Sequence, residues 1–104
     1  MNKRQWIVLC LLATGGVMQA QQWPDTPVEA RPGARWWWLG SAVDEKNLTY
    51  NLEEYARTGM GAVEITPIYG VQGNDANDIQ FLSPRWMEML KHTQAEGKRT
   101  GIEI

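Results

Sequence analysis

The side chains best suited to chemistry in this sequence are carboxylates that alternate with apolar residues in short segments. Glu64 lies between Val63 and Ile65 in the segment AVEITP. In a β-strand it would therefore point to the opposite face from both neighbours. Such a carboxylate could accept hydrogen bonds from ligand hydroxyls or help to bind a cation. Alternatively, it could be structural, paired with an arginine or lysine of a later strand. Glu103, in the segment GIEI, has the same alternation and the same two interpretations.

Aromatic residues form a second group of candidates. Trp36, Trp37 and Trp38 are consecutive, so a strand would divide their indoles between its two faces. An indole that faces helices would be core, whereas one at the end of the strand would offer a flat apolar platform with a free N–H. Trp38 lies closest to the C-terminal end, and we predict it as a binding residue, with core packing as the alternative. Tyr69 follows the second strand and is expected at the same end.

Two further groups are weaker candidates for metal binding or proton transfer. The run 74–78 (NDAND) is rich in oxygen ligands but lacks the glycine and distant glutamate of an EF-hand loop. We expect a solvated loop there and predict no metal ligand in the chain. His92 lies between Lys91 and Thr93 in a helical pattern. We predict it as a surface histidine without a partner rather than a general base.

These residues are positioned by strands and helices that alternate along the chain. Apolar segments predict strands at 35–40 and 62–67 and the start of a third at 101–104. Between them, Ser41, followed by Asp44, is predicted to cap a helix that ends at Gly59. Ser83 and Pro84 begin a second helix, which we expect to stop at Gly97. The segment 68–82 has no apolar periodicity and is predicted as a loop.

The β-α-β-α-β order predicts an α/β fold with parallel strands and right-handed crossovers. Two architectures fit, a (β/α)₈ TIM-type barrel and an open doubly wound parallel sheet. The turn after the first strand, LGSAV at 39–43, has no dinucleotide-binding glycine pattern. In a sheet covered on both faces, the carboxylates of the strands would be buried at a cost, whereas in a barrel they would line the interior. We therefore interpret 35–104 as the N-terminal, incomplete part of a barrel.

The first 20 residues have the pattern of a secretory signal peptide. Lys3 and Arg4 form a basic start, an apolar run follows at 6–17, and Ala20 is the best cleavage position. The run is too short for a transmembrane helix, so we expect no membrane span in the mature protein. Cys10 is a poor lipoprotein cysteine because the apolar run continues past it. The sequence thus predicts export, to the periplasm or outside the cell.

The composition of the chain without residues 1–20 indicates which classes of partner it can bind. Without residues 1–20, two of the 10 basic residues are lost and all 12 acidic residues remain, so the formal charge changes from −2 to −4. No basic patch is left, and nucleic acid is not expected as a partner. The single cysteine also lies in the predicted signal peptide. Three prolines within 21–34 predict an extended lead-in.

From RPGARWWWLGSAV through NLEEYARTGMGAVEITPIYG, the sequence resembles glycoside hydrolase family 106. These bacterial enzymes remove α-L-rhamnose from plant-derived glycans, and the similar region covers 31–104. The resemblance implies a (β/α)₈ catalytic domain, inverting hydrolysis by two carboxylates, and a calcium ion near the active site. In the family the acid and base come from later strands, so no catalytic residue is assigned in this chain.

The sequence therefore predicts an exported α-L-rhamnosidase-like hydrolase that acts on carbohydrate. Its predicted substrate-binding residues here are Glu64, Trp38, Tyr69 and Glu103. One alternative is a carbohydrate-binding or degenerate barrel that keeps the aromatic residues but has lost the carboxylate pair. Another is an exported binding protein of a different class, with its tryptophans packed in the core.

Overall fold

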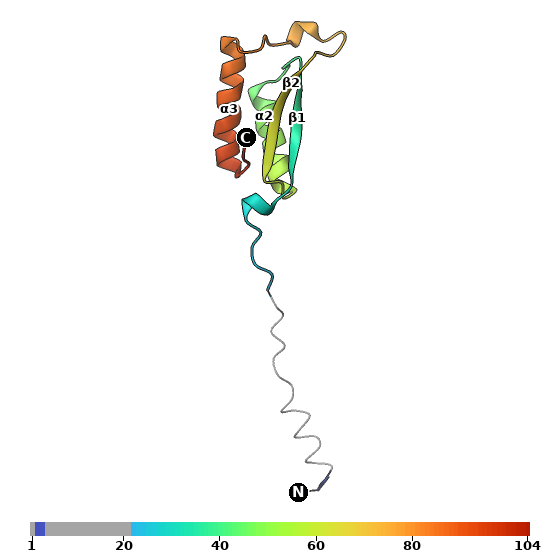
Figure 1. The fold of residues 1–104 in the computed structure, drawn as a ribbon, viewed down its shortest axis with the longest axis vertical. Coiled ribbons are helices and arrows are strands. Elements are labelled where there is room, and N and C mark those ends of the chain that lie inside the picture. Colours follow the sequence, from blue (N-terminus) through green and yellow to red (C-terminus); the bar gives the residue numbers. More distant parts are fainter. Residues whose placement is uncertain (1, 4–21) are drawn as a thin grey trace.

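A computed structural model describes residues 2–3 and 22–104 of the chain. The predicted signal peptide and its cleavage at Ala20 lie, apart from residues 2 and 3, outside the described part. Two strands and two helices alternate: β1 Gly33–Leu39, α2 Glu45–Arg57, β2 Ala62–Ile68 and α3 Pro84–Thr100. Short 3-10 turns, η1 Val28–Ala30 and η2 Asp75–Asn77, lie before β1 and after β2. The predicted order of elements is confirmed (Figure 1).

The strands β1 and β2 are parallel neighbours. Their register pairs Arg35 with Glu64 and Leu39 with Ile68. The chain after α3 returns to the other edge of β2, where the Glu103 N–H donates to the Gly61 carbonyl over 2.8 Å. The Val63 N–H in turn donates to the Glu103 carbonyl, also over 2.8 Å. A third parallel strand therefore begins beside β2, as the sequence predicts, although the described part contains only one bridge of it.

The core lies between the sheet and the two helices, which pack on the same face of it (Figure 1). One cluster joins Trp38 of β1 to Leu48 of α2 and to Trp86 and Met89 of α3. Leu52, Val63 and Ile102 form a second cluster, with Ile65 partly buried against the first. Apolar burial, the largest favourable term in folding, is thus concentrated on one face of the sheet.

The other face of the sheet carries every second residue of each strand, and no helix of the described part covers it. We call it the open face. Its residues are Arg35, Trp37, Leu39, Glu64, Thr66 and Ile68. Trp37 is 60% exposed and Leu39 is 41% exposed.

The first helix begins three residues later than its cap was predicted. Asp44 is the N-cap of α2, and its Oδ1 accepts from the Asn47 N–H over 2.9 Å. Ser41 has a left-handed backbone, with φ of 50°, and its hydroxyl accepts from Trp86 Nε1 over 2.9 Å. The predicted cap is therefore wrong, because a contact with α3 occupies the Ser41 side chain.

The second helix begins as predicted and ends later. Ser83 Oγ accepts from the Trp86 N–H, and Pro84 is the first helical residue. The helix continues through Gly97 and stops at Gly101, whose φ is 78°. Gly97 is buried beside the returning chain, and a Cβ there would lie 2.8 Å from the Ile102 carbonyl oxygen. Gly97 therefore does not end the helix; its lack of a side chain allows the returning chain to pack closely against it.

The lead-in reaches β1 along an exposed path. Trp23 is 92% exposed. The turn η1 interrupts the predicted extended segment, and the Gly61 N–H donates to the Pro32 carbonyl over 3.0 Å. No helix in the described part of the chain is both long and apolar enough to cross a membrane.

Candidate functional site

The open face carries an ion pair between the two strands. Arg35 Nε lies 3.3 Å from Glu64 Oε2, and the two side chains are 70% and 67% exposed. Glu64 thus points away from the helices, while its neighbour Val63 is 4% exposed in the core. Its cation comes from the preceding strand rather than a later one. Glu64 Oε1 has no hydrogen-bond partner among the described residues, so one carboxylate oxygen is left for other contacts.

Glu64 does not lie at the C-terminal end of the sheet. Strand β2 continues for four residues beyond it, to Ile68. At a rise of about 3.3 Å per residue, the carboxylate is roughly 13 Å short of the strand end. Its position is therefore in the N-terminal half of the open face.

Trp38 is in the core, which corrects its prediction as a binding residue. It is 1% exposed and packs against Leu48, Trp86 and Met89. It shares a strand face with Trp36, which is partly buried, and both indoles point towards the helices. Its Nε1 is buried and has no hydrogen-bond partner in the described part. The exposed indole of the run is Trp37, at mid-strand on the open face.

Tyr69 and Glu103 lie at opposite ends of the sheet. Tyr69 follows the last residue of β2 and is 82% exposed. Glu103 bridges to Ala62, the first residue of β2, and is exposed as well. Seven residues of strand separate the two ends, a distance of about 23 Å. The structure therefore does not gather the four predicted binding residues into one site.

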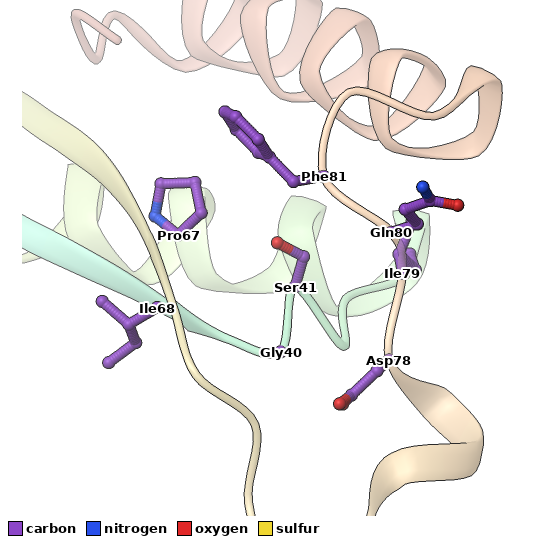
Figure 2. Close-up of a pocket in the computed structure, with 8 residues that line it drawn as sticks. All are labelled: Gly40, Ser41, Pro67, Ile68, Asp78, Ile79, Gln80 and Phe81. Atoms are coloured by element: carbon purple, nitrogen blue, oxygen red, sulfur yellow. The ribbon is translucent and has the colours of Figure 1, made fainter.

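A pocket of about 590 Å³ lies at the C-terminal ends of β1 and β2 (Figure 2). It is lined by Gly40, Ser41, Pro67, Ile68, Asp78, Ile79, Gln80 and Phe81. Two backbone hydrogen bonds of 3.0 Å build it: the Gly40 N–H donates to the Ile68 carbonyl, and the Ile79 N–H donates to the Gly40 carbonyl. The second of these brings the loop back over the end of the sheet.

Asp78 is the carboxylate of this pocket, and sequence reasoning missed it. The carboxylate lies directly against Gly40, where a Cβ would collide with Oδ1, and a Cβ at Gly70 would lie 2.5 Å from Oδ2. No hydrogen bond or ion pair of the Asp78 side chain occurs within the described residues. The available signal was a glycine shortly after each strand, at 40 and 70, which leaves room for a side chain at the strand ends.

The aromatic side of the pocket is held by a chain of contacts. Phe81 is 58% exposed and makes an edge-to-face contact with Trp86, at 4.9 Å between ring centroids. Trp86 in turn donates to the Ser41 hydroxyl. Ser41 and Leu82, with φ of 50° and 60°, are the positive-φ residues other than glycine in the described part. Backbone strain in this structure therefore flanks the pocket.

His92 is not the unpartnered surface residue that the sequence predicts. It is half-buried between α2 and α3. Its Nε2 lies 2.9 Å from Thr49 Oγ1 and 3.1 Å from the Glu45 carbonyl oxygen, with the tautomer left open. The histidine thus helps to hold the two helices together, because both partners lie on α2.

Ion pairs reinforce the same helix contact. Arg85 lies 2.9 Å from Glu45, and Arg99 lies 2.6 Å from both Glu53 and Glu96. The hydrogen bond from Arg99 lowers the pKa of Glu96, and the hydrogen bond from Arg85 lowers that of Glu45. These carboxylates are therefore more firmly ionised than free ones.

The described residues do not assemble a metal site of their own. No group of three or more histidine, cysteine, aspartate or glutamate side chains gathers among residues 2–3 and 22–104. Within the run 74–78, Asn77 Nδ2 donates to Asn74 Oδ1 over 2.7 Å. The calcium ion implied by the family resemblance stays a prediction, because these residues by themselves do not form such a cluster.

Comparison with known proteins gives one weak relationship. No protein-family model and no solved structure matches the chain. A protein of Formosa agariphila that is provisionally named a β-glucuronidase is 25% identical over 79 residues. The match covers 75% of this chain and 6% of the relative, so the chain spans a small fraction of the relative's length. The likeness supports a relationship to glycoside hydrolases, without pointing to family 106 or to rhamnosidases.

Proposed function

We propose that the chain is the N-terminal part of an exported glycoside hydrolase and that 33–104 supply the first strands of its catalytic domain. The likeness to the Formosa agariphila protein supports the enzyme class. The resemblance to family 106 favours an α-L-rhamnoside as substrate. The acid and base of the reaction are then expected from later strands, as an inverting hydrolase needs two carboxylates on opposite sides of the sugar.

The observation that carries this proposal is the open face. Both helices lie on one side of the parallel sheet, while Trp37 and the Arg35–Glu64 pair lie on the other. In a (β/α)₈ barrel the helix-free face becomes the interior, and substrate is bound at its C-terminal end. A doubly wound sheet would cover this face with later helices, and burial of the Arg35–Glu64 pair beneath them would be costly unless further hydrogen bonds satisfied it.

The test uses the full-length protein with chromogenic α-L-rhamnoside and β-D-glucuronide substrates. We expect hydrolysis of the rhamnoside. Glu64→Gln distinguishes two roles of that residue. Loss of a substrate contact would lower kcat/KM at least about tenfold, or about 1.4 kcal/mol, whereas a carboxylate about 13 Å short of the strand ends should leave kcat/KM nearly unchanged. Glu54→Gln is the matched control, since it removes the carboxylate of another exposed arginine pair, 2.6 Å from Arg57. Wild-type kinetics in the Glu64 variant would show that Glu64 only pairs with Arg35 and does not contact substrate.

A carbohydrate-binding protein without catalysis is the second candidate. One observation favours it: Asp78 is the single carboxylate that lines the pocket at the strand ends. Hydrolysis requires a second carboxylate, which later strands would have to supply. Sugar binding by the full-length protein without turnover of either substrate would select this candidate.

A further inference from the structure

We propose that the pocket at the C-terminal ends of β1 and β2 is a monosaccharide-binding subsite. In it, Asp78 accepts hydrogen bonds from sugar hydroxyls and Phe81 packs on the apolar face of the ring. The choice of a sugar as ligand rests on the proposed function. The location is independent of it, because ligands of parallel α/β sheets bind beyond the carboxyl ends of the strands in barrels and open sheets alike.

Asp78 is held in position but left unpaired. Its backbone neighbour Ile79 is fixed to Gly40 by a 3.0 Å hydrogen bond. Its carboxylate lies in the space that Gly40 and Gly70 leave by having no side chain. Two carboxylate oxygens without a partner in the described part can accept from two neighbouring hydroxyls, as a sugar diol presents them. The Asp78 side chain is exposed and therefore accessible to a ligand.

Phe81 supplies the apolar side of the subsite. The Trp86 contact fixes its ring, and Trp86 is itself fixed by the Ser41 hydroxyl. Even so, 58% of Phe81 is exposed. The Phe81 ring and the Asp78 carboxylate lie on opposite sides of the Gly40–Ser41 turn (Figure 2). Both groups line the same pocket, and a sugar ring has one rather apolar face for Phe81 and a rim of hydroxyls for Asp78.

Two further observations concern the space and the backbone of this pocket. Its volume of about 590 Å³ has room for a monosaccharide, and the pocket is widely open to solvent. Ser41 and Leu82 flank it in the left-handed backbone region, which is unfavourable for residues with a Cβ. Such strain persists only where the surroundings impose it, and it is concentrated at ligand sites.

The experiment measures sugar binding by the full-length protein, with free L-rhamnose, D-glucuronate and D-glucose as probes in calorimetry and ligand-observed NMR. Asp78→Ala should weaken binding of the preferred sugar about tenfold or more, as expected for lost hydrogen bonds to a charged group. Phe81→Ala should weaken it about threefold or more. Asp75→Ala is the matched control, because Asp75 is an exposed aspartate of the same loop outside the pocket.

The outcomes separate this proposal from the proposed function. Hydrolysis that is equally efficient in the Asp78, Phe81 and Asp75 variants would overturn the subsite and leave the enzyme intact. Binding that depends on Asp78, without hydrolysis, would retain the subsite and reject the enzyme. If none of the three sugars binds the wild-type protein, the subsite is rejected. Phe81→Leu, which keeps apolar bulk, replaces the alanine variant if the latter unfolds.

Discussion

Replacement of Trp38 tests whether the core has been assigned to the correct indole. The side chain is 1% exposed and contacts residues of both helices. Trp38→Ala should therefore destabilise the fold by about 3–5 kcal/mol, the usual range for a buried aromatic residue. Trp38→Phe should have a different effect on the free energy of unfolding. The smaller ring loses about 1–1.5 kcal/mol of burial. Removal of the buried, unpartnered Nε1–H returns about 1–3 kcal/mol, because a donor without an acceptor is unfavourable in the core.

The net effect of Trp38→Phe is thus expected between a cost of about 0.5 kcal/mol and a gain of about 2 kcal/mol, by the difference of these two effects. Native-state hydrogen exchange of β1 and α3 in the full-length protein measures the opening free energy of this region without assuming two-state unfolding. Tyr50→Ala is the control for loss of a large aromatic group, since Tyr50 is 59% exposed. If the phenylalanine variant is as unstable as the alanine variant, the indole N–H is satisfied and the argument fails.

Three further predictions concern processing, pH and packing. Exported protein should begin after Ala20, which N-terminal sequencing checks; an N-terminus at Met1 would reject the signal peptide. Arg99 holds the pKa of Glu96 below its usual 4.5. The pair therefore stabilises the fold above the unfolded pKa and loses that effect as the pH falls through the lowered pKa of Glu96, seen as faster hydrogen exchange in α3. Gly97→Ala should destabilise by about 0.5–2 kcal/mol, because the clash of its Cβ with the Ile102 carbonyl exceeds the helix-propensity gain. Gln94→Ala, exposed on the same helix, should change stability by less than about 0.5 kcal/mol.

Local patterns predicted the elements well, because the order of strands and helices depends on nearby residues. Alternation in β2 correctly separates buried Val63 from exposed Glu64. The Ser83–Pro84 helix start is confirmed for the same reason, since the cap and the first turn are contiguous in sequence. The closed barrel is not part of this success, because the described part contains only two full strands. It stays a prediction.

The errors share one cause, a contact with a residue far away in sequence. Ser41 and Asp44 are both good N-caps, and the Trp86 indole decides between them. Three identical residues at 36–38 carry no internal indication of which face is buried, so the helices decide it. Asp78 reaches the end of the sheet through the hydrogen bond between its neighbour and Gly40. No periodicity in a loop predicts such a contact.

Glu64 and Asp78 differ in the contacts that hold their carboxylates, and this difference predicts the role of each residue. Glu64 is held by Arg35 through one oxygen, and as an exposed pair this is worth only about 0–1 kcal/mol. If later strands enclose the open face, the same pair loses water and becomes costly unless further hydrogen bonds satisfy it. Because Glu64 lies about 13 Å short of the strand ends, those bonds are expected from side chains of later strands. Asp78 has no cationic partner within residues 2–3 and 22–104, and it lies at the strand ends, where ligands of barrels bind. Asp78 is therefore expected to govern sugar affinity, whereas Glu64, about 13 Å short of the strand ends, should affect the stability of a closed interior more than turnover.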